Sequence, residues 1–137
     1  MNSAMRQAIS EPPLFQGHDT PAKVLRSRAR DWAARPALRH KRRGLWQTLT
    51  WADYYAQARA FGLALRDLGV ERGEVIAVLA ENRPEWVIAD MGAQAMGMVG
   101  NGVYPTASTD QLHHILTDSA CRVLVVENQE QIGRAHV

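Results

Sequence analysis

The sequence has a single cysteine and no long hydrophobic run. One cysteine excludes an internal disulfide and is typical of a reducing compartment. The longest unbroken apolar stretch, VIAVLA, is far shorter than the roughly 20 residues that a membrane-spanning helix needs. The start, MNSAMRQAISEPPLFQGHD, has no apolar segment behind a basic one, so we expect no signal peptide. Together these absences predict a soluble, cytoplasmic chain.

The sequence also lacks a strong excess of charge of either sign. The formal net charge is +2, which is too small to imply a nucleic-acid partner. The densest basic stretch, RHKRR at residues 39–43, could attract phosphate, but no aromatic residues are interleaved with its charges. A hairpin turn is exposed to solvent in any case. We therefore favour a solvated turn at this stretch and expect no nucleic-acid partner.

No metal site or phosphate loop is visible. His113 and His114 are adjacent, so on a helix their side chains point about 100° apart and cannot hold one metal ion. The glycine-rich stretch GAQAMGMVGNG has neither a GxGxxG fingerprint after a strand nor a GK[ST] sequence. We therefore assign Gly92 and Gly97 to close helix packing.

The remaining polar candidates have structural explanations. Ser108 and Thr109 suit the capping of a helix, while Cys121 opens a buried strand and is predicted to be an inert thiol. Asp90 and Gln94 lie one turn apart on a mainly apolar helix, where burial beside a loop backbone explains them as well as chemistry does. We predict that this chain carries no catalytic, cofactor-binding or metal-binding residue.

The first part of the chain predicts a helix and a hairpin. Residues 1–18 are polar and unpatterned, so we expect a flexible lead-in. Thr20 as N-cap and Pro21 at the first helical position predict the start of a helix. Apolar residues at helical spacing follow, and Pro36 is predicted to end the helix. The segment PALRHKRRGLWQTLT is typical of two short strands joined by the basic turn KRRG.

A second helix is specified at both ends. Thr50 is its predicted N-cap, with Asp53 three residues later as a variant of the capping box, and Gly69 suits the left-handed position just past its end. An apolar stripe at helical spacing predicts its buried face. The stripe consists of Trp51, Tyr54, Tyr55, Ala58, Phe61, Leu65 and Leu68.

From residue 74 onward, apolar runs alternate with helical patterns. EVIAVLA is typical of a strand covered on both faces, and NGVYPT and CRVLVVE predict two further strands. The intervening helices are NRPEWVIADMGAQAMGMVG, whose small residues would let it approach a sheet closely, and STDQLHHILTDS. This alternation is typical of right-handed parallel crossovers. We therefore predict an α/β fold, an open and mostly parallel sheet with flanking helices, preceded by a helix and a short hairpin.

Three stretches resemble the N-terminal part of the adenylate-forming acyl-CoA synthetases. They are TLTWADYY, LGVERGEVIAVLA followed by ENRPEW, and AQAMGMVGNGVYPT, in the family's order and spacing. The combination of NRPEW, YPT and QLHHILTDS is most similar to long-chain fatty-acid–CoA ligases. The resemblance implies that residues 19–131 are an incomplete N-terminal portion of an AMP-binding domain. It also places Trp86 and Tyr104-Pro105-Thr106 at framework positions, to which we assign packing roles.

The resemblance also implies an activity for the full-length enzyme. Such enzymes use ATP and Mg²⁺ to convert a fatty acid to an acyl-adenylate, and then transfer the acyl group to coenzyme A. The family's phosphate loop, Tyr-Gly-x-Thr-Glu segment, ribose-binding aspartate and C-terminal lysine are not found in this sequence. We therefore expect an inactive fragment that binds none of these molecules. We expect no transmembrane segment, although a fatty-acid substrate allows peripheral contact with a membrane.

Two other interpretations stay open. The first is a free-standing, non-catalytic nucleotide-binding α/β module, which a glycine fingerprint after a strand would support. The second is a natural short protein that docks onto a full-length synthetase, which would require a genuine stop codon after Val137.

The last residues, 132–137, read IGRAHV and show no apolar period, cap or partner element. A common sequencing adapter, read as ATC GGA AGA GCA CAC GTC TGA, encodes this sequence followed by a stop. We therefore expect residues 132–137 to be adapter-derived and the natural sequence to end at or inside Gln131. A chain that stops after CRVLVV would leave a sheet edge and an apolar face uncovered, which favours aggregation.

Overall fold

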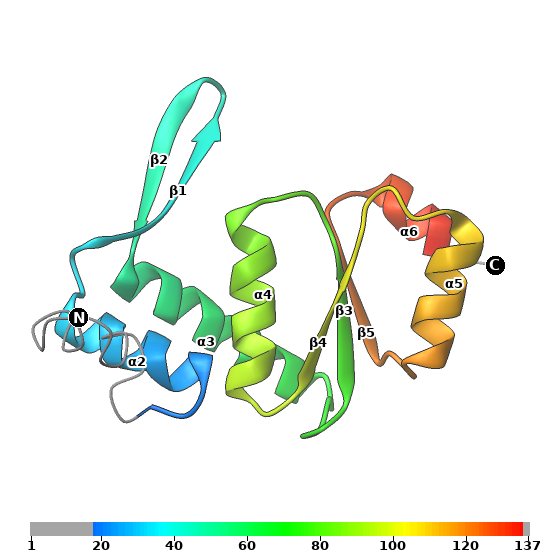
Figure 1. Ribbon diagram of the computed structural model, residues 1–137, viewed down its shortest axis with the longest axis horizontal. Coiled ribbons are helices and arrows are strands. Elements are labelled where there is room, and N and C mark those ends of the chain that lie inside the picture. The colour runs from blue at the N-terminus through cyan, green and yellow to red at the C-terminus, as the bar shows by residue number, and fades with distance from the viewer. Residues whose placement is uncertain (1–17, 136–137) are drawn as a thin grey trace, which may run out of the picture.

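The structure, a computed structural model, describes residues 18–135. The predicted lead-in at residues 1–18 lies outside this range, apart from His18. A helix and a hairpin precede alternating strands and helices, which confirms the predicted α/β fold class (Figure 1). The elements are α2 (Pro21–Asp31), β1 (Pro36–Arg42), β2 (Leu45–Thr50), α3 (Trp51–Asp67), β3 (Val75–Leu79), α4 (Pro84–Ala95), β4 (Val99–Val103), α5 (Thr109–Asp118), β5 (Val123–Val126) and α6 (Gln129–Ala135).

The main sheet has three parallel strands in the order β4-β3-β5. Helices α3 and α4 cover one face, and α5 and α6 lie on the other (Figure 1). The expectation of an uncovered apolar face is wrong for β3, because Leu112 of α5 is fully buried against Ala77 and Leu79, whereas the residues of β5 are only half-buried. The expectation of an open edge is met, since within residues 18–135 both β4 and β5 pair with β3 alone.

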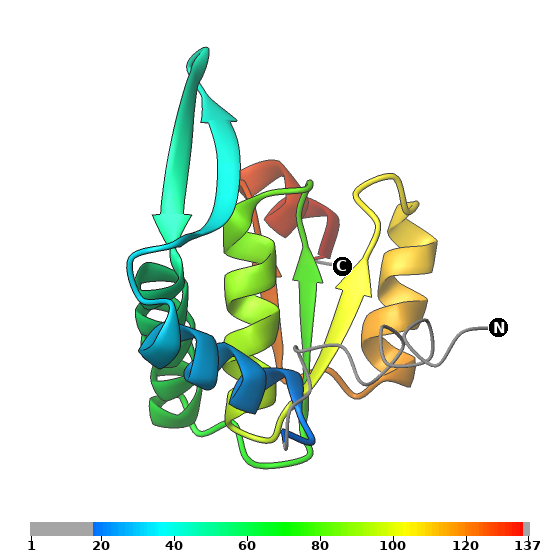
Figure 2. The ribbon, with the colours of Figure 1, turned by 60° about the vertical axis from the view of Figure 1, so that its left-hand side comes forward.

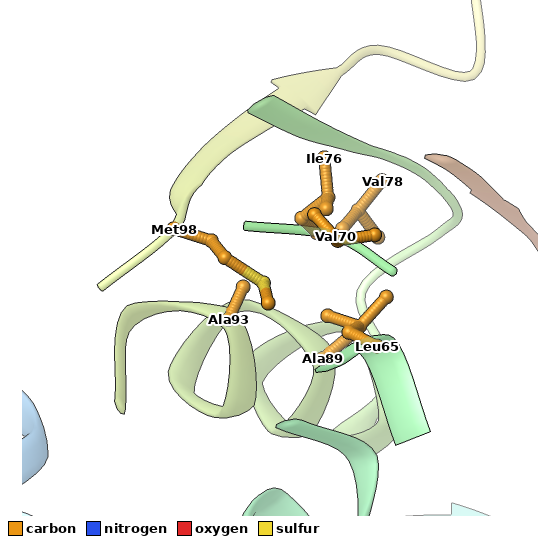
Figure 3. Close-up of a cluster of buried hydrophobic side chains, with 7 residues drawn as sticks. All are labelled: Leu65, Val70, Ile76, Val78, Ala89, Ala93 and Met98. Atoms are coloured by element: carbon orange, nitrogen blue, oxygen red, sulfur yellow. The ribbon is translucent and has the colours of Figure 1, made fainter. Parts of the chain in front are cut away.

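The core between the sheet and the helices α3 and α4 is made of apolar side chains (Figure 3). Ile76 and Val78 of β3 point from the sheet toward α3 and α4, as alternate residues of a strand must. Full burial of each such side chain stabilises the fold by about 1.5–3 kcal/mol. The cluster consists of Leu65, Val70, Ile76, Val78, Ala89, Ala93 and Met98.

The start and end of α3 follow the sequence signals. The Thr50 hydroxyl accepts a hydrogen bond from the Asp53 backbone N–H at 3.1 Å, and the Asp53 carboxylate accepts one from the Thr50 N–H at 2.9 Å. Gly69 has φ +83°, and the Val70 N–H then donates to the Leu65 carbonyl, which ends the helix. Leu68 was wrongly predicted as buried: it is the C-cap residue and its side chain is 72% exposed.

Helix α2 ends earlier than the sequence predicts. Its last residue is Asp31, and Pro36 instead opens β1. The residues after Asp31 make backbone hydrogen bonds to the start of α3, where Trp51 donates to the Arg35 carbonyl and Ala52 to the Ala33 carbonyl. These tertiary bonds compete with further helical bonds, so the apolar spacing alone overestimates the length of the helix.

The small residues of α4 contact a helix as well as the predicted sheet: Ala93 lies in the core cluster with Ile76 and Val78 of β3, while Gly92 lies against α3. Gly92 of α4 faces Gly62 of α3, so closely that a Cβ on either glycine would lie 2.5 Å from a backbone oxygen of the other helix. The assignment of Gly92 to close helix packing is therefore confirmed. Gly97 serves a different purpose: it follows the C-cap of α4 and has φ +77°, which favours glycine.

The end of the described chain is the helix α6, so the expectation of a tail without a cap is wrong for residues 132–135. The Asn128 side chain accepts a hydrogen bond from the Gln131 N–H at 3.1 Å, and the buried Gln131 side chain accepts one from the Glu127 N–H at 2.7 Å. Arg134 of α6 donates to the carbonyl oxygens of Pro105 and Ala107. The adapter origin of residues 132–137 stays a prediction.

Candidate functional site

The loops that follow β3 and β4 leave the sheet toward opposite faces. The chain after β3 enters α4, which packs with α3, and the chain after β4 enters α5 on the other side (Figure 2). Neighbouring parallel strands whose connections separate in this way leave a crevice at their carboxyl ends, which is where open α/β sheets bind ligands. The fold therefore places a candidate site at the ends of β3 and β4.

A hollow of about 430 Å³ occupies this position. The loop after β3 contributes Glu81 and Asn82, the loop after β4 contributes Tyr104 and Thr106, and α4 contributes Trp86. The other lining residues are Ala80, Gly102, Val103 and Pro105. Polar groups from two loops thus converge on one concave surface with an aromatic ring in its wall, an arrangement typical of small-molecule sites.

Two glycines of β4 are in close contact with side chains of α4. The Trp86 ring lies against Gly102, where an added Cβ would be 2.8 Å from its Cζ2 atom, and one helical turn later the Asp90 carboxylate lies against Gly100. Asp90 also accepts a hydrogen bond from the Gln94 side chain at 2.7 Å. The packing role predicted for Trp86 is therefore confirmed, and the polar pair is explained by contact with the sheet.

Tyr104 and Thr106 are exceptions to the predicted packing roles, since both are exposed, whereas Pro105 is half-buried. The Tyr104 side chain is 82% exposed and lies at the rim of the hollow. It also borders a second hollow of about 570 Å³, on the α5 side of β4, together with Gln111 and His114. The prediction that Tyr104 packs was wrong, because the sequence alone does not show that the chain leaves the sheet at Val103.

Glu127 fixes the loop between β3 and α4. Its carboxylate accepts hydrogen bonds from the Glu81 backbone N–H at 3.1 Å and from the Arg83 guanidinium at 2.6 Å. These two donors hold the pKa of Glu127 below its ordinary value. Glu127 was not predicted as a functional residue, although an acidic side chain directly after an apolar parallel strand is a recognisable signal. Glu127 thus ties the wall of the hollow to the end of β5.

The other polar residues considered in the sequence do not converge. Ser108 caps α5, with its hydroxyl accepting a hydrogen bond from the Gln111 N–H at 3.2 Å, and Thr109 is the first helical residue. His113 is half-buried, and His114 is exposed. Burial raises the pKa of the Cys121 thiol, as expected for an unreactive cysteine. None of these side chains lines the hollow between β3 and β4.

The described residues do not by themselves fit a nucleoside triphosphate. Within residues 18–135, the lining of the hollow has one carboxylate and no lysine or arginine to meet phosphate charge. The same range has no cluster of three or more His, Cys, Asp or Glu side chains that could hold a metal ion. None of the helices described is long and apolar enough to cross a membrane. Among the described residues, the site is a shaped and partly polar surface whose one charged lining side chain is Glu81.

Comparisons with known proteins give one family. The family model described as AMP-binding enzyme matches residues 25–136. The long-chain-fatty-acid–CoA ligase ACSBG2 of Mus musculus is 31% identical over 121 residues, which make up 86% of this chain and 18% of that protein. The chain therefore spans less than a fifth of the length of this curated relative.

Solved structures share the fold. O-succinylbenzoate coenzyme A synthetase from Bacillus subtilis, solved with AMP, matches with a TM-score of 0.70 and 27% identity, over 77% of this chain and 26% of that one. The fatty acid AMP ligase from Legionella pneumophila matches with a TM-score of 0.72 and 20% identity, over 82% of this chain and 20% of that one. The second likeness concerns the fold alone.

Proposed function

The chain belongs to the AMP-binding enzyme family, and we propose that it forms the N-terminal part of a long-chain fatty-acid–CoA ligase. The whole ligase would use ATP and Mg²⁺ to convert a fatty acid to an acyl-adenylate, and would then transfer the acyl group to coenzyme A. We further propose that this reaction takes place in the cytoplasm. These activities belong to the whole protein, of which this chain supplies residues 19–131.

Two observations carry the proposal. The family model matches residues 25–136, and the mouse relative is a long-chain-fatty-acid–CoA ligase by name. The hollow at the ends of β3 and β4 supports it, because it offers Glu81, Asn82 and Thr106 at the place where an α/β sheet binds ligands.

The chain alone is proposed to be inactive. Phosphoryl and adenylyl transfer depend on cations that stabilise charge in the transition state. The hollow has none among its described lining residues, and the motifs that supply them in this family are not found in the sequence. No observation on the structure favours a free-standing nucleotide-binding module.

The experiment compares the chain with the whole protein encoded at its source locus. Both are incubated with palmitate, ATP, Mg²⁺ and coenzyme A, and AMP, pyrophosphate and palmitoyl-CoA are measured. The whole protein is expected to form all three, and the chain alone none. Replacing palmitate with acetate or benzoate tests the acid class. Activity with benzoate but not palmitate would overturn the long-chain assignment, and no AMP with any acid would overturn the ligase function.

A further inference from the structure

The hairpin of β1 and β2 projects away from the body of the molecule (Figures 1 and 2). Only its base is packed: Leu38 and Leu49 join the cluster around Leu25 and Tyr54. All residues from Lys41 to Thr48 are exposed. The distal half of the hairpin therefore makes no contribution to the core, although it is well paired as a ribbon.

The hairpin is strongly basic, and most of its charge lies in the distal half. Lys41, Arg42 and Arg43 lie in that half and Arg39 just before it, and residues 36–50 contain no Asp or Glu. None of the four forms an ion pair within the described part of the chain. These charges are not used to stabilise the fold and are free to meet an anionic surface.

Two large apolar side chains stand among these charges. Leu45 and Trp46 are each 68% exposed, and as neighbours on a strand they point to opposite faces of the ribbon. In the strand register Leu45 lies opposite Arg42 and Trp46 opposite Lys41, whose ammonium group is 6.0 Å from the centre of the Trp46 ring. A partner lying on one face would cover only one of the two, whereas insertion from the tip covers both.

We propose that the distal half of this hairpin, residues 41–46, docks tip-first onto a bilayer surface that contains anionic phospholipids. Trp46 would lie at the level of the headgroups, where tryptophan is enriched in membrane proteins, and Leu45 at the boundary with the acyl chains. The long basic side chains reach back to lipid phosphates. A nucleic acid or an acidic peptide would neutralise the charge but would leave Leu45 in a polar environment. The inference rests on the hairpin alone and is independent of the ligase proposal.

Flotation of the chain with lipid vesicles tests the charge requirement and separates bound chain from aggregates, which sink. We expect binding to vesicles of phosphatidylcholine mixed with phosphatidylserine, and much weaker binding to phosphatidylcholine alone. Each cation near an anionic surface contributes roughly fivefold to binding, so Lys41→Gln with Arg42→Gln should weaken it roughly 25-fold. The control variant, Arg59→Gln with Arg66→Gln, also removes two positive charges, but from exposed positions on α3. Its binding to the vesicles should stay within about twofold of that of the parent chain.

Two apolar variants test insertion. Trp46→Ala with Leu45→Ser should weaken binding about tenfold, whereas Leu68→Ser, at a side chain that is 72% exposed on another element, should not. Vesicles should also shift tryptophan emission to shorter wavelength, and Trp46→Phe should abolish this shift while retaining binding. Circular dichroism confirms that each variant is folded.

Three results would overturn the inference. The first is equal binding of the chain to neutral and to anionic vesicles. The second is a loss of binding in the Arg59→Gln/Arg66→Gln control as large as in the Lys41→Gln/Arg42→Gln variant. The third is a shift of tryptophan emission that persists in Trp46→Phe. Tight binding of the chain to an acidic peptide or to RNA, with no flotation on anionic vesicles, would assign the hairpin to that other partner.

Discussion

Gly62 of α3 and Gly92 of α4 face each other where the two helices cross. A Cβ at residue 62 would lie 2.5 Å from the Gly92 carbonyl oxygen, and a Cβ at residue 92 would lie 2.5 Å from the Ala58 carbonyl oxygen. Both distances are shorter than van der Waals contact, and the opposing atoms belong to backbone, which cannot rotate away. The position of α4, and hence of the hollow beside Trp86, depends on these two glycines.

Gly92→Ala is therefore expected to destabilise the chain. Alanine favours a helix over glycine by up to about 1 kcal/mol, but forcing the helices apart costs about 1–3 kcal/mol, so we expect a net loss of about 1–2 kcal/mol. Gly133→Ala in α6 is the matched control, because its Cβ would meet no atom within 4 Å. Urea unfolding measures the stability of both variants. A Gly92→Ala chain that is at least as stable as the Gly133→Ala chain would contradict the close contact between α3 and α4.

Ser108 and Thr109 are adjacent hydroxyl residues with different roles. Ser108→Ala removes the cap of α5 and should lower the free energy of unfolding by about 1 kcal/mol, since its hydroxyl accepts the Gln111 N–H. Thr109→Ala, at the first helical position, should change it much less. Thermal unfolding of the two variants compares them directly. Equal losses of stability in the two variants would show that Ser108 is not the residue that caps α5.

The contact of Trp86 with Gly102 predicts a coupled pair. Gly102→Ala places a Cβ 2.8 Å from the Trp86 ring and should destabilise the chain by about 1–3 kcal/mol. Trp86→Phe shortens the side chain and should make Gly102→Ala nearly harmless. A double-mutant cycle in urea should therefore give a coupling energy of about 1–2 kcal/mol. Additive effects of the two substitutions would exclude the contact.

Glu127 predicts a loss of stability in acid. Its folded pKa lies below the ordinary value of 4.5, so its contribution is complete above 4.5 and is lost as the pH falls through the folded pKa. Glu127→Gln should be less stable at neutral pH and should lose less stability on acidification. Glu71→Gln removes an exposed carboxylate that makes no side-chain hydrogen bond among the described residues, so it is the control for the loss of one negative charge. An identical dependence of stability on pH in all three proteins would contradict the stabilising role of the Glu127 carboxylate.

Local features were predictable from the sequence because the groups involved lie within a few residues of each other. Thr50 and Asp53 form their capping box across three residues, and Gly69 adopts its positive φ next to the helix that it ends. The strands were predicted for a similar reason, since a continuous apolar run such as VIAVLA needs cover on both faces.

The features that the sequence did not reveal depend on partners distant in the chain. The small side of α4 was recognisable, but only the fold shows that Gly62, thirty residues earlier, is its partner. Trp51 and Arg35 shorten α2 through a tertiary backbone bond. The hollow needs the strand order β4-β3-β5, which places the loops after β3 and β4 side by side. The motifs NRPEW and YPT supply most residues of the hollow, but the sequence does not show that the two motifs line one surface.

The central claim is that this chain is the N-terminal part of an AMP-forming fatty-acid–CoA ligase. Sequencing the source DNA across the codon for Gln131 tests it most directly. We predict that the reading frame continues without IGRAHV, through a Ser/Thr/Gly-rich loop that ends in Pro-Lys and on to a Tyr-Gly-x-Thr-Glu segment. A genomic sequence that itself encodes IGRAHV followed by a stop codon would contradict it and would favour a short, non-catalytic protein.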